Sequence, residues 1–172
     1  MTATDTDSAF TGFVEEYQGA LRRTAYFLTG NPQAAEDLLQ DALVKAWLAW
    51  RRIGPGGELA YTRRIMVNLA TDRWRRRRYE TTPLEPTDTS PDPHAGDPFS
   101  AADDRDFIVR QLATLSAKER AIVVLRYYAD LSEADVADAA GVSVGTVKST
   151  CSRALARLRS RGEAAQATRS RS

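Results

Sequence analysis

The sequence predicts an all-α protein made of two small helical domains, which are joined by an acidic, proline-rich linker. Three observations support this fold class. Apolar residues recur at helical spacing in both halves of the chain, capping residues and glycine or proline breaks delimit these runs, and five of the seven prolines lie within residues 79–104. The 172 residues, 42% of them hydrophobic, suffice for two small domains, and no run reads convincingly as a β-strand.

The first domain, residues 8–78, is predicted to hold three helices. Apolar side chains at helical spacing predict the first helix, which stops at a Gly-Asn-Pro break. Within that break, Asn31 is expected to cap the second helix and Pro32 to occupy its first position. A loop rich in glycine and proline then leads to the third helix, over residues 59–79. The apolar contacts expected from the third helix are Ile65, Leu69 and Trp74.

The second helix is expected to separate an apolar stripe from a polar face. The stripe consists of Leu38, Leu39, Ala42, Leu43, Ala46, Trp47 and Trp50. The opposite face carries Asp37, Gln40, Asp41 and Lys45. An amphipathic helix of this kind buries its apolar stripe, so its polar face is free to meet a partner.

The proline-rich segment, residues 79–104, predicts a semi-extended, flexible linker. It contains seven acidic residues, no basic residue and few large apolar side chains. Such a segment cannot bury enough apolar surface to offset the entropy of ordering it, and its prolines favour extended backbone. The tail, residues 162–172, is small and polar and is expected to be disordered.

The formal net charge of +1 hides an uneven distribution of charge. Residues 1–78 hold 12 basic and 9 acidic residues, and residues 105–162 hold 10 and 6. Two basic segments therefore flank the acidic linker. This asymmetry is typical of a protein with an anionic partner such as nucleic acid, although two solvated surfaces would show the same charges.

The second domain, residues 105–161, is predicted to begin with a short amphipathic helix. Ser116 and Glu119 have the spacing of a capping box, which would start a second helix. Ser132 is expected to start a third helix, and Gly141 to end it, because glycine readily adopts the left-handed conformation at a helix end.

The last two helices predict a helix-turn-helix. Ala137, Gly141 and Val147 supply a small residue, a turn glycine and an apolar anchor at the spacing of this motif in bacterial DNA-binding proteins. The N-terminal residues of the second helix of such a motif enter the major groove. A plain helical hairpin with a polar face is the alternative. The outward candidates for DNA contact are Ser143, which also caps the helix, Gly145, Thr146, Lys148, Ser149, Ser152, Arg153 and Arg157.

A basic helix over residues 61–78 is a second candidate for nucleic-acid binding. It carries seven arginines and one acidic residue, Asp72, together with aromatic side chains. Arginines suit a phosphate backbone and aromatic rings can stack on bases, while Asn68 can hydrogen-bond a base edge. A solubilising or RNA-binding run would look the same.

Other function classes are disfavoured by what the sequence lacks. One cysteine, Cys151, and one histidine, His94, cannot form a disulfide framework or a four-ligand zinc site, so no metal is expected. No P-loop or Ser-His-Asp set is present, so neither enzymatic activity nor a cofactor is expected. No run approaches about 18 apolar residues, and the N-terminus is polar. Membrane insertion and secretion are therefore not expected, and a cytoplasmic protein is the default prediction.

Three stretches carry a resemblance to a known family. They read AAEDLLQDALVKAWLAW (34–50), AYTRRIMVNLATDRWRRRR (60–78) and LSAKERAIVVLRYYADLSEADVADAAGVSVGTVKSTCSRALARLR (115–159). In this order they resemble the extracytoplasmic-function sigma factors of bacterial RNA polymerase, most closely the actinobacterial branch, over roughly residues 8–160. The resemblance implies a sigma factor that binds core RNA polymerase, recognises the minus-thirty-five and minus-ten elements of promoter DNA and promotes strand opening.

The resemblance also assigns roles to residues. The first domain would be sigma region 2, in which Asp37, Gln40, Asp41 and Lys45 contact core polymerase. Minus-ten DNA binding would fall to Arg63, Arg64, Asn68, Asp72, Arg73 and Arg76, and the loop from Ile53 to Leu59 would capture an unstacked base. For Trp47 and Trp50, core packing is favoured over a role in strand separation. The second domain would be sigma region 4, whose helix-turn-helix reads the minus-thirty-five element.

Departures and alternatives remain. The family often has an arginine where Thr150 stands, so a DNA contact is expected to be missing there. A conventional helix-turn-helix regulator would bind a palindrome as a dimer, and an RNA-binding adaptor would use the arginine helix alone. Oligomeric state discriminates, because a free sigma factor is expected to be a monomer. The family is often held inactive by an anti-sigma factor, which adds a further candidate partner.

Overall fold

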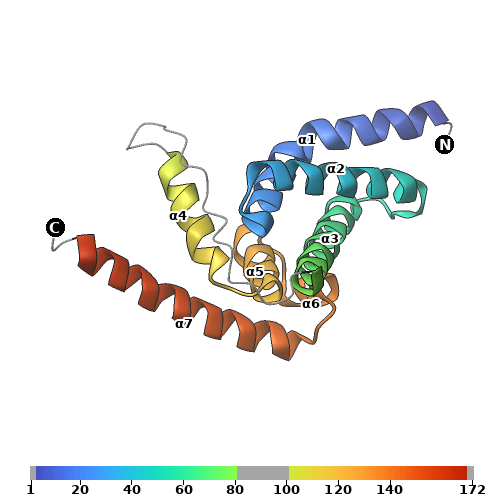
Figure 1. Cartoon of the computed structure of the whole chain (residues 1–172). Helices are drawn as coiled ribbons and strands as arrows, with labels where there is room; N and C mark the ends of the chain where they lie inside the picture. Colours follow the sequence, from blue (N-terminus) through green and yellow to red (C-terminus); the bar gives the residue numbers. More distant parts are fainter. Residues whose placement is uncertain (1–2, 81–100, 170–172) are drawn as a thin grey trace. The chain divides into compact units, whose positions relative to one another are not determined.

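The computed structural model of the chain describes residues 3–80 and 101–169, and every regular element within these ranges is a helix (Figure 1). The chain divides into two compact units, Met1–Pro91 and Asp92–Ser172, here called the N-unit and the C-unit. The all-α class and the division into two helical domains agree with the prediction. In the described parts of the chain, no helix is long and apolar enough to cross a membrane.

The N-unit contains α1 (Ala3–Thr29), α2 (Pro32–Ala49), a short 3-10 helix η1 (Trp50–Arg52) and α3 (Glu58–Glu80). α2 runs back along α1, and α3 packs against α2 (Figure 1). The predicted break between the first two helices is confirmed. The Asn31 side chain accepts a hydrogen bond from the Ala34 backbone N–H at 2.9 Å, and Pro32 takes the first helical position, where a missing N–H costs nothing.

The core of the N-unit is formed by one side of each long helix. Leu21, Leu38 and Met66 are fully buried. The predicted contacts of α3 need correction, because Met66 and Val67 are buried whereas Trp74 is 37% exposed. The apolar pattern of this arginine-rich helix is too sparse to fix its rotation, so the packing against α2 decides which residues are inside.

The C-unit contains α4 (Ala101–Ala113), α5 (Ala117–Val123), a π-helical turn η2 (Val124–Tyr128), α6 (Glu133–Ala140) and α7 (Val144–Arg169). The predicted capping box at the start of α5 is confirmed, since Ser116 and Glu119 each hydrogen-bond the backbone of the other. Gly141 ends α6 in the left-handed conformation, at φ 63°, as predicted.

The π-helical turn was not predicted. Five consecutive residues from Ala121 to Leu125 are buried, a run without helical periodicity that carries no signal for the extra residue. The backbone N–H of Ala129 reaches the carbonyl of Val124, five residues back, at 3.0 Å. Tyr127 and Tyr128 consequently lie at the surface.

The ends of two predicted segments differ from the structure. The linker was predicted over 79–104, but α3 extends to Glu80 and α4 starts at Ala101, so its ends are helical and its middle lies outside the described residues. The tail was predicted to be disordered from residue 162, whereas α7 continues to Arg169. Alanines and glutamine in this stretch are good helix formers, which extend a helix already nucleated by the residues before them.

Candidate functional site

The polar face predicted on the second helix is exposed. It combines with two apolar side chains that the sequence analysis had not singled out, Val44 (58% exposed) and Leu48 (73% exposed). These follow Asp37 at helical spacing, seven and eleven residues on, and therefore lie on the same side of α2. We call this set the α2 face. Its members are Asp37, Gln40, Asp41, Val44, Lys45 and Leu48, all exposed.

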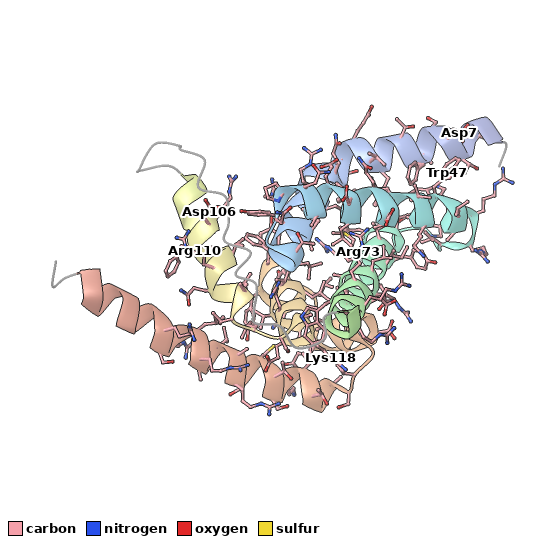
Figure 2. The ribbon with its side chains drawn as sticks, viewed as in Figure 1. Asp7, Trp47, Arg73, Asp106, Arg110 and Lys118 are labelled. Atoms are coloured by element: carbon pink, nitrogen blue, oxygen red, sulfur yellow. The ribbon has the colours of Figure 1, made fainter. Side chains whose placement is uncertain are left out.

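A shallow apolar hollow borders the α2 face. It has a volume of about 380 Å³ and lies between α1 and α2, where Figure 2 marks Asp7 and Trp47. Trp47 is 37% exposed and its ring centroid is 5.0 Å from that of Phe10. Exposed apolar side chains that gather beside polar ones are typical of a protein-binding surface. The hollow is lined by Asp7, Phe10, Thr11, Leu43, Val44 and Trp47.

The outer side of α3 carries four of the six residues predicted to bind minus-ten DNA. Arg64, Asn68, Asp72 and Arg76 are spaced four apart and are exposed or half-buried. Tyr61, 38% exposed, precedes Arg64 by three residues and joins the same side. We call these five residues the α3 face. The sequence shows that this helix contains aromatic residues. It does not show on which side of α3 Tyr61 lies, because that depends on the rotation of the helix.

The other two predicted residues, Arg63 and Arg73, lie away from the α3 face. Both are half-buried and occupy the side of α3 that carries the buried Met66. Arg73 Nη2 forms an ion pair with Asp41 Oδ2 at 2.5 Å and also donates to the backbone carbonyl of Asp37 at 3.4 Å. Arg73, marked in Figure 2, therefore joins α3 to the α2 face.

A second hollow of about 500 Å³ lies between α1 and the loop before α3. Ile53, Pro55 and Glu58, from the predicted base-capturing loop, line one side of it. Phe13, Tyr17 and Trp50 supply aromatic walls. A hydrogen bond with Glu16, together with the negative charge of that carboxylate, raises the pKa of Tyr17.

Trp50 is 7% exposed and belongs to the core. Its ring centroid lies 5.0 Å from that of Phe10 and 5.1 Å from that of Phe13. Trp50 is therefore mainly a core residue, although it also forms part of the wall of the second hollow. Trp47, by contrast, is only partly covered.

The C-unit presents the helix-turn-helix, α6 and α7. Val136 and Val147 are fully buried between the two helices, and the Val142 N–H donates to the Ala137 carbonyl at 3.0 Å across the turn. Ser143 accepts a hydrogen bond from the Thr146 backbone N–H at 3.1 Å and so caps α7. All eight predicted DNA-contact residues are exposed. We call them the α7 face: Ser143, Gly145, Thr146, Lys148, Ser149, Ser152, Arg153 and Arg157.

Two cations of the α7 face are held by carboxylates of neighbouring helices. Lys148 Nζ lies 3.4 Å from Glu133 Oε2 on α6, and Arg157 forms a short ion pair with Glu119 on α5. Burial raises the pKa of Glu119, but hydrogen bonds from Ser116 and the Arg157 guanidinium outweigh it and lower the pKa below its ordinary value. The capping box and the ion pair therefore act on one carboxylate.

Thr150 is 6% exposed and faces the core of the C-unit. The Thr150 side chain therefore does not belong to the α7 face, and the missing DNA contact at this position stays a prediction. Cys151 is also buried, and burial raises the pKa of its thiol. Among the described residues, no three His, Cys, Asp or Glu side chains gather as metal ligands.

Comparison with known families matches both units. Residues 13–79 match sigma-70 region 2, and residues 108–158 match sigma-70 region 4. The chain is 42% identical to the RNA polymerase sigma-E factor of Streptomyces avermitilis, over 87% of this chain and 83% of that protein. It is 35% identical to the ECF RNA polymerase sigma factor SigL of Mycobacterium tuberculosis, over 84% of each chain.

Two solved structures are similar to this chain over most of its length. The sigma factor RpoE from Bartonella quintana, crystallised with the anti-sigma factor NepR, superposes with a TM-score of 0.69 at 30% identity, covering 88% of this chain and 95% of that one. CnrH, solved with the cytosolic domain of CnrY, has a TM-score of 0.67 at 24% identity and shares the fold.

Proposed function

The chain belongs to the extracytoplasmic-function sigma factors of bacterial RNA polymerase, and from this premise we propose which of its surfaces perform each step of initiation. As a sigma factor it binds core RNA polymerase, recognises the minus-thirty-five and minus-ten promoter elements and promotes strand opening. It is a transcription initiation factor and not an enzyme. The mechanism is accordingly differential binding, in which each surface favours one state of the polymerase or the DNA.

The α2 face is the proposed contact with core polymerase. Its support is the combination of exposed carboxylates with exposed Val44 and Leu48, next to the hollow beside Trp47. In such a contact the charged groups steer the approach of the partner, and the apolar side chains supply the surface that is buried. This part of the proposal extends the predicted contact, Asp37, Gln40, Asp41 and Lys45, by the two apolar side chains.

The α3 face and the second hollow are the proposed minus-ten site. Arg64 and Arg76 would hold phosphates, Asn68 would meet a base edge, and Tyr61 would stack on a base. The second hollow, with its aromatic walls and the Glu58 carboxylate as hydrogen-bond acceptor, would take one unstacked base. Stacking returns about 1–3 kcal/mol per base, comparable to the few kcal/mol that unstacking costs. Strand opening therefore needs several of these contacts together.

The α7 face is the proposed reader of the minus-thirty-five element. Hydroxyls of Thr146 and Ser149 suit base edges or phosphates, and Lys148 and Arg153 can also read guanine. Gly145, the second residue of α7, has no side chain, so the helix backbone can approach the duplex closely at this position. Because the two units are tethered, weak binding by each sums through effective concentration once polymerase fixes their separation.

We propose further that the free chain is a monomer in the cytoplasm, where its polymerase partner works. An anti-sigma factor is the proposed inhibitor, supported by the similar sigma factor RpoE, which was crystallised with the anti-sigma factor NepR. Binding of an anti-sigma factor over the exposed apolar part of the α2 face would compete with core polymerase.

The observation that carries these assignments is the separation of three exposed faces on three different helices. Run-off transcription with purified core polymerase, on promoter DNA selected by the holo-enzyme, tests them. Asp37→Ala/Asp41→Ala is expected to lose core binding, and Lys148→Ala/Arg153→Ala to keep core binding but lose the upstream promoter contact. The matched controls are Asp5→Ala/Glu15→Ala on α1 and Arg105→Ala/Arg110→Ala on α4, which each remove two exposed charges outside the three faces.

A wild-type chain that never binds core polymerase, yet binds duplex DNA specifically by itself, would contradict the proposal. Equal losses in the control variants would show that net charge, rather than the assigned faces, decides binding.

A further inference from the structure

Arg73 belongs to the helix proposed to bind DNA, but its guanidinium is held by the helix proposed to bind polymerase. Its Nη2 atom donates both to the Asp41 carboxylate and to the Asp37 carbonyl. One nitrogen therefore serves two acceptors of the α2 face. A phosphate can bind this end of the guanidinium only in competition with Asp41, since a donor hydrogen already directed at a carboxylate is not available elsewhere.

The two ends of this ion pair differ in access. The Asp41 side chain is 57% exposed, whereas the Arg73 side chain is 32% exposed. A cation of a partner protein can thus reach the carboxylate from solvent without first displacing the arginine. The neighbouring acid, Asp37, has a different side-chain partner, because its Oδ1 accepts from Gln33 Nε2 at 3.2 Å. Asp37 and Asp41 therefore carry equal charges on one face, but only Asp41 shares its carboxylate with Arg73 in the described contacts.

We propose that the Arg73–Asp41 ion pair is a latch that couples polymerase binding to DNA binding within the N-unit. When a polymerase cation binds Asp41, the pairing of this carboxylate with Arg73 weakens or breaks. The guanidinium then becomes available to a phosphate of the minus-ten strand. The proposal rests on the assigned roles of the α2 and α3 faces. Linkage requires the reverse effect as well: occupation of Arg73 by a phosphate releases Asp41 for polymerase.

The size of the coupling is bounded by the strength of the pair. Exposed ion pairs contribute modestly, which corresponds here to about a two- to fivefold change in affinity. The latch thus adjusts the order of binding and does not act as an absolute block. It lowers DNA binding by the free chain and restores it in the holo-enzyme.

A double-mutant cycle on the full chain tests the latch. The variants are Asp41→Asn, Arg73→Gln and both together, and the probe is a single-stranded oligonucleotide that carries the minus-ten element of a promoter selected by the holo-enzyme. Without polymerase, Asp41→Asn is expected to tighten binding about two- to fivefold. In the Arg73→Gln background the same change is expected to give no such gain. Thermal melting checks that every variant is folded.

Asp37→Asn is the matched control, since it removes an equal charge four residues away and leaves the Arg73 contact with the Asp37 carbonyl in place. Equal tightening by Asp37→Asn and Asp41→Asn would overturn the latch, because net charge alone would then explain the gain. Persistence of the Asp41→Asn gain in the Arg73→Gln background would overturn it as well.

A second measurement does not depend on DNA. Arg73→Gln frees Asp41, so core polymerase is expected to bind this variant about two- to fivefold more tightly. Weaker core binding would mean that Arg73 only orients Asp41, and the latch would be wrong. Failure of the proposed function gives a different result: Arg64→Ala/Arg76→Ala, which leaves the ion pair intact, would then bind the oligonucleotide as tightly as wild type.

Discussion

The α3 face and the α7 face are both proposed to bind promoter DNA, yet they offer different chemistry. The α3 face combines arginines with an exposed tyrosine and lies on the same unit as a hollow with aromatic walls. The α7 face consists mainly of hydroxyls and a glycine, with three cations. Stacking and charge suit single-stranded DNA, whereas short hydrogen-bonding side chains at the start of a helix suit the major groove of a duplex.

The two helices also differ in how their arginines are held. Arg157 pairs with Glu119, a carboxylate already fixed by the Ser116 capping box, so this ion pair is part of the C-unit framework. Arg73 pairs with Asp41, an exposed group of another proposed interface. Similar ion pairs can therefore serve stability in one unit and communication in the other, depending on what else binds the carboxylate.

The largest expected effects come from removing two cations from each face in the holo-enzyme. Arg64→Ala/Arg76→Ala should weaken binding of the minus-ten strand by about 10- to 100-fold, to a similar extent for different sequences. Lys148→Ala/Arg153→Ala should weaken binding of the minus-thirty-five duplex by a similar factor, but more for the selected sequence than for random DNA.

Salt titration separates the two cases further. The slope of log affinity against log salt should fall by about 1.4 for two single-strand phosphate contacts and by up to about 1.8 for two duplex phosphate contacts. A sequence-dependent loss from the α3 variant, or a uniform loss from the α7 variant, would reverse the assigned chemistry.

Thr150→Arg tests the inner limit of the α7 face. A charge placed at this buried position must be desolvated or must distort the helix packing, so the C-unit should lose about 2 kcal/mol of unfolding free energy or more. Thermal melting measures the loss. Ser149→Arg, one residue earlier and exposed, is the control and should change stability by no more than about 0.5 kcal/mol. An unchanged melting temperature for Thr150→Arg, with tighter DNA binding, would show that an arginine at this position reaches the DNA.

The sequence predicts the ends of helices better than their rotation. Helix ends were predictable, because Asn31, Ser116, Gly141 and Ser143 act through local backbone chemistry that depends on few neighbours. The rotation of a helix about its axis is decided by packing. In α2, where the apolar residues form a clear stripe, most of the residues predicted to be inside are buried and the predicted polar face is exposed.

Where the stripe was weak, the sequence left the rotation open. In α3 the inward positions of Arg63 and Arg73 follow from tertiary packing that seven arginines and few apolar residues do not encode locally. The exposed Val44 and Leu48 were missed for a related reason, since an apolar residue on a helix is expected inside until the structure shows otherwise. The π-helical turn at 124–128 gave no sequence signal at all.

Gly145→Ala should separate stability from binding on the α7 face. A Cβ at this position would meet nothing closer than the Ser143 hydroxyl oxygen at 3.9 Å, so the protein has room for it. Alanine should raise the stability of the C-unit by about 0.5–1 kcal/mol, because it favours the helix. The added methyl group should weaken minus-thirty-five binding by about fivefold, a loss on the order of 1 kcal/mol. If DNA binding improves together with the melting temperature, Gly145 does not approach the duplex.

The smallest expected effect concerns the framework ion pair. Glu119→Gln keeps a hydrogen-bond acceptor for Ser116 but loses the charge that pairs with Arg157, so the C-unit should lose about 0.5–1 kcal/mol at neutral pH. Because the folded pKa of Glu119 is depressed, the wild-type advantage is complete above the unfolded pKa of a glutamate and disappears as pH falls through the folded pKa.

Wild type and Glu119→Gln should therefore converge in stability under acid conditions, when both side chains are neutral. Urea unfolding across this pH range measures the difference. A difference that persists at acid pH would mean that the amide disturbs the capping box itself. The corresponding change in the N-unit, Asp41→Asn, removes a more exposed carboxylate and should alter stability less, so its main effect should be on binding. A large stability loss from Asp41→Asn would make the two ion pairs alike and remove the distinction between them.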